Sequence, residues 1–188
     1  MTAPLPYHKI SHGDINNGIY VGNIDMSKFA GFVELVENLG MVTFEGNVSV
    51  LGGITAKHGS GIKTTGDLIC ESYIRSDLDI LCGGRIDATH DLKTRGNIIA
   101  VDEIKGSTIK AKGSIKSGGK IITSEEINCK GTVYAGEGIE FRLNIFARNG
   151  LTYGNSDCGI IVTMDITAFD KAVRAITTRK DEVGLDIR

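Results

Sequence analysis

The sequence predicts an all-β protein built as a three-sided β-solenoid, or β-helix, of about six coils, with helical caps at its N- and C-terminal ends. Two observations predict this fold. An aliphatic residue recurs every six positions between residues 42 and 145, and a small residue follows most of these anchors two positions later. A third observation excludes collagen, because the 25 glycines lack a three-residue period and are accompanied by only 2 prolines.

The six-residue spacing of the aliphatic anchors favours short strands joined by bends. A helix of 3.6 residues per turn cannot keep every sixth residue on one face. The repeat contains one eight-residue step, from Ile54 to Ile62, and one five-residue step, from Ile104 to Ile109. The anchors are Val42, Val48, Ile54, Ile62, Leu68, Ile74, Ile80, Ile86, Leu92, Ile98, Ile104, Ile109, Ile115, Ile121, Ile127, Val133, Ile139 and Ile145.

Each six-residue unit is expected to direct one large and one small side chain inward, because residues i and i+2 of a strand point to the same side. Glycine is frequent four residues after an anchor, where a corner needs an unusual φ or a close backbone approach. Three units then close one coil of about 18 residues. Cys70, Cys82 and Cys129 occupy the small inward position, so they are predicted to fill the core. No CxxC spacing occurs, and neither a metal site nor a cofactor is expected.

Three segments are expected along the chain. Residues 1–41 form an N-terminal segment with an amphipathic capping helix from Asp25 to Leu39, ended by Gly40 as a left-handed C-cap. Residues 42–149 form the solenoid. Residues 150–188 contain a strand at 159–166, a second capping helix at about 167–178 and a solvated tail. Caps are expected because the end of a solenoid exposes a core layer and unpaired strand edges. The apolar face of the first helix comprises Phe29, Phe32, Val33, Val36 and Leu39.

The order of residues in GNIIAVDEIKGSTIKAKGSIKSGGKI resembles that of bactofilins, the polymer-forming β-helical cytoskeletal proteins of bacteria. The resemblance covers about residues 42–149 and implies a β-helical core that polymerises end to end. The six-residue period is also similar to that of left-handed hexapeptide-repeat proteins, many of which are acyltransferases. In that family the small residue usually lies two positions before the aliphatic one. Two capping helices would block end-to-end stacking, which favours a discrete particle here.

A basic strip is predicted on one outward face, where eight cationic residues fall in register from coil to coil. Because like charges opposite one another on neighbouring strands are destabilising, such a strip suggests an anionic partner, either a nucleic acid or an acidic protein surface. The alternative is an ordinary solvated face that Asp91 and Glu126 partly neutralise. The basic strip comprises Lys57, Arg75, Lys93, Arg95, Lys110, Lys112, Lys130 and Arg148.

A second outward face is apolar and carries Leu81, Ile99, Val101 and Tyr134. A contiguous exposed stripe of this kind suggests a partner or a twofold self-contact. The alternative is that the N-terminal segment folds back and covers it. The segment's apolar residues are Ile10, Ile15, Ile19 and Tyr20. The third face shows no bias.

The function expected from these features is non-enzymatic, through binding of a protein partner or self-assembly as a homo-oligomer. One alternative is a small inhibitor or decoy of the phage-encoded kind, which would present the basic strip to a host enzyme or nucleic-acid complex. Another is an acyltransferase, for which His58 and His90 at corners would be the candidate general bases. No catalytic residue is assigned. The start of the chain lacks the pattern of a signal peptide and no apolar run could span a bilayer, so a cytoplasmic protein without a membrane partner is expected.

Overall fold

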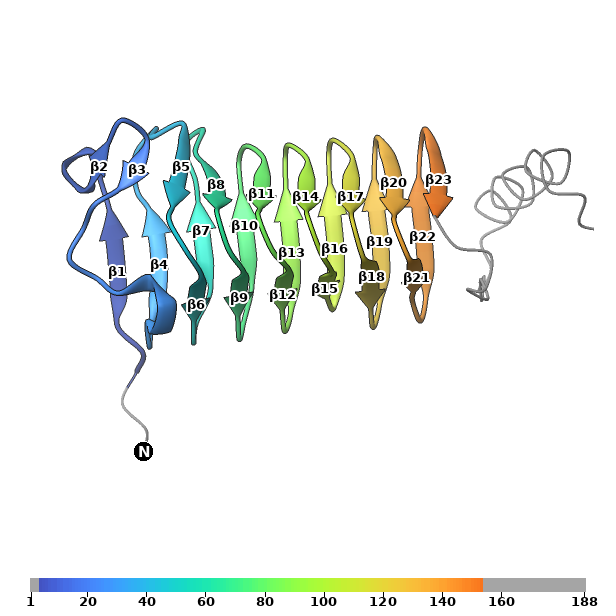
Figure 1. Cartoon of the computed structure of the whole chain (residues 1–188), viewed down its shortest axis with the longest axis horizontal. Helices are drawn as coiled ribbons and strands as arrows, with labels where there is room; N and C mark the ends of the chain where they lie inside the picture. The colour runs from blue at the N-terminus through green and yellow to red at the C-terminus, as the bar shows by residue number, and fades with distance from the viewer. Residues whose placement is uncertain (1–3, 154–188) are drawn as a thin grey trace, which may run out of the picture.

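The computed structural model describes residues 4–153, which form a three-sided β-solenoid (Figure 1). Three sheets run along its length, and within each sheet nearly all neighbouring strands are parallel and come from successive coils. Sheet A has eight strands, which corresponds to about seven turns rather than the six expected. At an interstrand spacing of ~4.8 Å, the solenoid is about 34 Å long.

Each full coil contributes one short strand to each sheet, whereas the first and last described coils have no strand in sheet C. Sheet A contains β1 (Tyr7–Ile10), β4 (Phe32–Leu35), β7 (Ile54–Ala56), β10 (Ile74–Ser76), β13 (Asp91–Thr94), β16 (Thr108–Ala111), β19 (Glu126–Cys129) and β22 (Asn144–Ala147). Sheet B contains β2 (Ile15–Asn16), β3 (Ile19–Tyr20), β5 (Met41–Phe44), β8 (Gly61–Thr64), β11 (Ile80–Cys82), β14 (Ile98–Ala100), β17 (Ile115–Ser117), β20 (Thr132–Ala135) and β23 (Gly150–Tyr153). Sheet C contains β6 (Val48–Val50), β9 (Leu68–Cys70), β12 (Ile86–Ala88), β15 (Ile104–Gly106), β18 (Lys120–Thr123) and β21 (Gly138–Glu140).

The core consists of the predicted aliphatic anchors, stacked coil over coil. Ile80, for example, pairs in register with Ile62 on one side and Ile98 on the other, and all three are fully buried. The small positions two residues later also point inward, including Cys70, Cys82 and Cys129. Burial raises the pKa of each of these thiols, that of Cys129 to about 11, so all three stay protonated near neutral pH.

The two irregular steps of the repeat are absorbed at corners, and the strand register continues through them. After β7 the two extra residues form a turn in which His58 and Gly59 adopt left-handed φ angles of 56° and 78°. After β15 the corner is one residue shorter, yet Ile109 still pairs with Leu92. The strands therefore keep their alignment because only the corners change length.

The corner between sheets A and B is held by a polar ladder, formed by Asp79, Asn97, Ser114 and Thr132. The backbone N–H of Asn97 donates to Asp79 Oδ1 (2.7 Å), and that of Ser114 donates to Asn97 Oδ1 (2.8 Å). Gly113 leaves room for this contact, since a Cβ there would lie 2.3 Å from Asn97 Oδ1. The glycine four residues after an anchor is thus required by a close approach, which is one of the two reasons that the sequence suggested.

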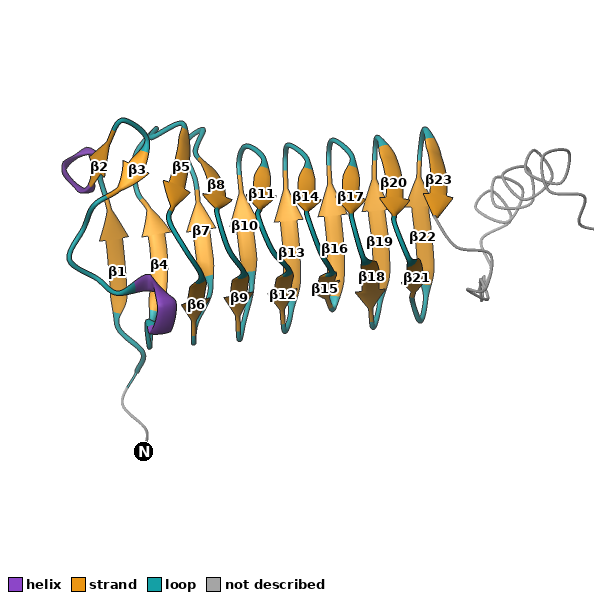
Figure 2. Cartoon of the chain, viewed as in Figure 1, coloured by secondary structure: helices purple, strands orange, loops and turns teal. Residues whose placement is uncertain are grey.

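The predicted N-terminal capping helix is wrong. Asp25 caps only a single 3-10 turn, Met26–Lys28, and the chain then forms β4, which lies between β1 and β7 in sheet A (Figure 2). Val33 and Leu35 point into the core while Glu34 faces outward, so the burial alternates with the two-residue period of a strand. A helix at this place would leave the backbone edge of β7 unpaired, which explains why the strand prevails.

The N-terminal end is instead covered by aromatic side chains. The ring of His8 lies edge-on to both Tyr20 and Phe29, and its Nε2 is hydrogen-bonded to the Tyr20 hydroxyl at 3.0 Å. Tyr20 also packs against Phe44, whose side chain occupies the usually small inward position of the first full coil. Gly40 does adopt the predicted left-handed φ, at 62°, but it lies in a turn before β5 rather than at the end of a helix. The predicted strand at 159–166 and helix at 167–178 lie outside the described residues.

Candidate functional site

The basic strip is assembled on sheet A as expected. Arg75, Lys93 and Lys110 are direct neighbours in the ladder from β10 to β16. A second column follows two residues later along each strand, where the backbone N–H of Lys112 donates to Thr94 and that of Lys130 donates to Ala111. The structure therefore brings the predicted strip residues onto one face of the solenoid.

About half of the charge of the strip is nevertheless neutralised, because four carboxylates of the same sheet pair with its cations. At least five of its eight cations form ion pairs, and one of their partners is Glu34, which lies within the segment that was expected to be a helix. Burial raises the pKa of the Asp91 carboxyl, but the hydrogen bonds and charges of Lys93 and Arg75 outweigh it and hold that pKa below its usual value. Among the described residues, Lys112 and Lys130 have no ion-pair partner. The pairs are Lys57–Glu34 (2.8 Å), Arg75–Asp91 (3.2 Å), Lys93–Asp91 (2.5 Å), Arg95–Asp77 (3.4 Å) and Lys110–Glu126.

The apolar face lies on sheet B, and its central residues are solvent-exposed. Ile99 and Tyr134 are each 37% exposed and Val101 is 62% exposed, while Leu81 is half-buried. Leu81 and Ile99 are direct neighbours in the ladder from β11 to β14. We call this surface the sheet B patch, defined by Leu81, Ile99, Val101 and Tyr134.

Sequence reasoning missed one member of this surface. Lys116 lies between Ile99 and Tyr134 in the same outward column, and its Nζ is 5.7 Å from the centre of the Tyr134 ring. The signal was present, because Lys116 follows the anchor Ile115 as Ile99 follows Ile98. Along this column, two coils with apolar outward residues are therefore followed by Lys116 and then by Tyr134, whose ring Lys116 contacts.

The N-terminal segment does not fold back over the sheet B patch. β1 pairs with β4, and β3 pairs with β5, so both extend the end of the solenoid instead. Ile10 is fully buried there. The alternative of an intramolecular cover by this segment is therefore wrong.

The two corner histidines lie at different edges of the triangular coil. His58 follows β7, at the corner between sheets A and B, whereas His90 lies between β12 and β13, at the corner between sheets C and A. Both side chains are exposed. The structure does not bring them together into one site.

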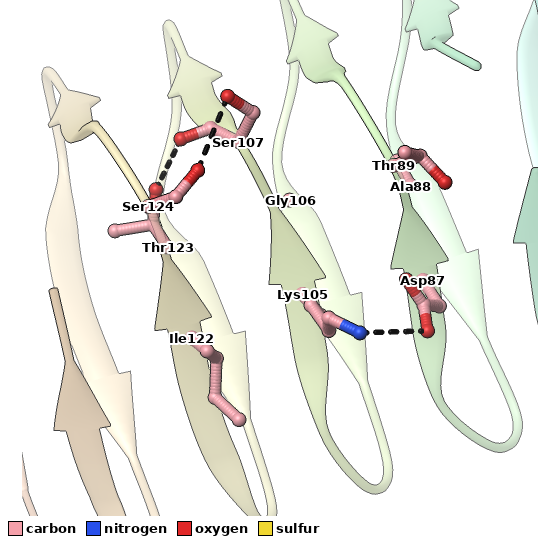
Figure 3. Close-up of a pocket in the computed structure, with 9 residues that line it drawn as sticks. All are labelled: Asp87, Ala88, Thr89, Lys105, Gly106, Ser107, Ile122, Thr123 and Ser124. Atoms are coloured by element: carbon pink, nitrogen blue, oxygen red, sulfur yellow. Dashed lines mark hydrogen bonds and ion pairs between the residues drawn. The ribbon is translucent and has the colours of Figure 1, made fainter. Parts of the chain in front are cut away.

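A shallow depression of about 250 Å³ lies along sheet C, next to the shortened corner after β15 (Figure 3). The side chain of Lys105 reaches toward Asp87 (Nζ–Oδ2 3.5 Å), and the hydroxyls of Ser107 and Ser124 are 3.3 Å apart. The depression is smaller than the ~300–1,000 Å³ of typical ligand pockets, and its lining groups bond to one another. It gives no basis for assigning a ligand.

Residues 4–153 contain neither a metal-binding cluster nor a membrane-spanning helix. No group of three or more histidine, cysteine, aspartate or glutamate side chains in this range is arranged to hold a metal ion. Within the same range, no helix has the length and apolar character needed to cross a membrane.

No protein-family model, no curated protein and no solved structure matches this chain.

Proposed function

We propose that this protein acts by self-association, as a non-enzymatic β-solenoid that binds a second copy of itself through the sheet B patch. The observation that carries the proposal is the exposure of Ile99, Val101 and Tyr134 on one regular face within three consecutive coils. Exposed apolar residues gathered on one face of a folded domain are typical of an interaction site, and here Lys116 alone separates Ile99 from Tyr134 in the outward column. Tyrosine is moreover enriched in protein interfaces.

The three faces differ in their charge, and this difference supports the choice of sheet B. The outward residues of sheet A are dominated by paired lysines, arginines and carboxylates, and those of sheet C include the Lys105–Asp87 and Lys120–Glu140 pairs. In the centre of sheet B, from β11 to β20, Lys116 is the only charged residue among the outward residues. Depletion of charged residues distinguishes the core of an interface from the rest of a protein surface.

The test is the native mass of the full chain, measured by light scattering over a hundredfold concentration range at low and high salt. The unmodified protein is expected to form a small oligomer whose mass falls on dilution. The double variant Leu81→Asp/Ile99→Asp should remain monomeric throughout, because it places charges in the contact.

A matched control makes the same kind of change on another face. Ile69→Asp/Ile122→Asp alters two outward isoleucines of sheet C and should leave the mass unchanged. The proposal is wrong if the sheet B double variant keeps the mass of the unmodified protein, or if the unmodified protein is monomeric at every concentration. A ladder of growing masses would favour end-to-end polymerisation instead.

A further inference from the structure

The outward residues of sheet B form a column that can pack against a copy of itself running in the opposite direction. Successive coils place Lys63, Leu81, Ile99, Lys116 and Tyr134 in one column, from β8 to β20. This column contains cations, apolar residues and an aromatic ring, but no carboxylate. A second copy packed on this face therefore has to avoid placing lysine against lysine.

Twofold symmetry allows few arrangements of two sheets packed face to face. If the solenoid axes are parallel and the twofold axis runs along this column, each residue lies opposite itself, so Lys63 and Lys116 each meet their own copies. If the axes are antiparallel with the twofold axis at Ile99, only Ile99 meets itself. Leu81 then faces the partner's Lys116, and Lys63 faces the partner's Tyr134.

The antiparallel arrangement improves both charge contacts. The aliphatic stem of Lys116 can pack along Leu81 while its ammonium group remains at the rim. The ring of Tyr134 already has Lys116 of its own chain 5.7 Å from its centre, and the partner's Lys63 would approach the same ring from the other sheet. A cation near an aromatic ring is attracted to its π-face, whereas facing lysines repel.

The neighbouring column of sheet B is self-complementary in the same register. It runs through Thr65, Gly83, Val101, Gly118 and Gly136 in successive coils. The twofold axis that passes Ile99 also passes Val101, so this most exposed residue of the patch meets its copy at the centre. Gly83 then faces the partner's Gly118, and Thr65 faces the partner's Gly136, so small residues flank the central valines and permit close approach.

We propose that two copies of this chain pack sheet B on sheet B with antiparallel axes, Ile99 and Val101 lying on the twofold axis. The arrangement rests on the proposed self-association and adds its geometry. Its partner is a second copy of this chain, identified by the complementarity of the two columns.

Glutamate substitutions at Leu81 and Ile99 test the arrangement, because it assigns them opposite outcomes. Ile99→Glu places two glutamates opposite one another on the twofold axis and should raise the dimer dissociation constant about 100-fold or more. Leu81→Glu places each glutamate opposite the partner's Lys116, so the dissociation constant should stay within about threefold of the original and rise with added salt. The double variant Leu81→Glu/Lys116→Glu, which opposes two carboxylates, should dissociate like Ile99→Glu.

Sedimentation velocity of the full chain reports these constants, and Ile122→Glu on sheet C serves as the matched control for an isoleucine-to-glutamate change. It should leave the dissociation constant unaltered. A dimer that Leu81→Glu and Ile99→Glu weaken equally overturns the antiparallel register but leaves self-association intact. A monomeric unmodified protein, or a dimer that neither variant weakens, overturns both proposals.

Discussion

The glycines of the corners are explained by the oxygen atoms that occupy the space of their missing side chains. A Cβ at Gly66, Gly84, Gly96 or Gly113 would lie within 2.1–2.3 Å of a carboxylate or amide oxygen of the preceding coil. Those oxygens accept backbone N–H groups that would otherwise lack a partner at the corner. Each of these glycines therefore permits one such hydrogen bond, Gly96 and Gly113 at the corner between sheets A and B, and Gly66 and Gly84 at the corner between sheets B and C.

Gly113→Ala should lower the free energy of unfolding by about 1–3 kcal/mol, because the new methyl group displaces the Asn97 side chain from the Ser114 N–H. Urea unfolding monitored by circular dichroism measures this change. Gly119→Ala is the matched control. It has the same position in the next repeat unit, but the nearest atom to its Cβ would be 3.3 Å away, so the cost should stay below about 1 kcal/mol. Equal losses for the two variants would contradict the explanation.

The inward small positions are also partly explained at this scale. The hydroxyl of Thr64 donates to the carbonyl of Gly66 (2.9 Å), and that of Ser76 donates to the carbonyl of Ser60 (3.1 Å). Every buried side-chain nitrogen and oxygen in the described part of the chain has a hydrogen-bond partner. Serine and threonine are thus tolerated in this core because the corners supply carbonyl acceptors.

At the scale of the element, the apolar residues around the segment from Phe32 to Leu35 are compatible with either a helix or a strand, and the two differ in which side chains they bury. A helix would bury Val36 with Phe32 and expose Leu35, whereas the strand buries Val33 and Leu35. Neighbours decide between them, since β1 and β7 offer hydrogen bonds on both sides of β4.

Leu35→Ala should therefore cost about 2–4 kcal/mol of unfolding free energy, as expected for a fully buried leucine. Val36→Ala should cost less than about 1 kcal/mol, because its side chain is only partly buried outside the core. Chemical denaturation of the two single variants measures both losses of unfolding free energy. A larger loss for Val36→Ala than for Leu35→Ala would support a helix at this place.

The success of prediction along the chain follows from how locally each feature is encoded. The anchors, the inward cysteines and the basic column were predictable because every unit repeats the same two-residue alternation. β4 was not, because Phe29, Val33 and Val36 also fit a helical spacing and the repeat register is broken before Val42. The place of Lys116 in the sheet B column was not predicted because only apolar residues define that face in the sequence. The pairing of Glu34 with Lys57 was not predicted because Glu34 lies in the segment expected to be a helix.

At the scale of the whole molecule, the solenoid is a one-dimensional stack whose ends differ. The N-terminal end is covered by the His8, Tyr20 and Phe29 rings. At the other end, the anchor Ile145 and Leu151, the register partner of Val133, are only partly buried, whereas Ile127 and Val133 are fully buried. Within the described residues, β22 and β23 pair on one side only.

Backbone amides of β22 and β23 should therefore exchange with solvent at least about tenfold faster than those of β13 and β14, because among residues 4–153 these two strands are hydrogen-bonded to a neighbouring strand on one side only. Hydrogen exchange followed by mass spectrometry on the full chain would resolve the two regions. β1 and β4 should exchange more slowly than β22 because aromatic side chains cover their end. Uniform protection from one end to the other would contradict this gradient.

The turn at His58 and Gly59 shows that the solenoid accepts extra residues at a corner without losing alignment on either side. This tolerance makes the molecule a natural display scaffold. A foreign peptide grafted between these two residues would project from a rigid edge, while the strands before and after it keep their partners. The interval between grafts at successive corners would be set by the coil rise of ~4.8 Å, so the spacing of displayed peptides could be chosen in fixed increments.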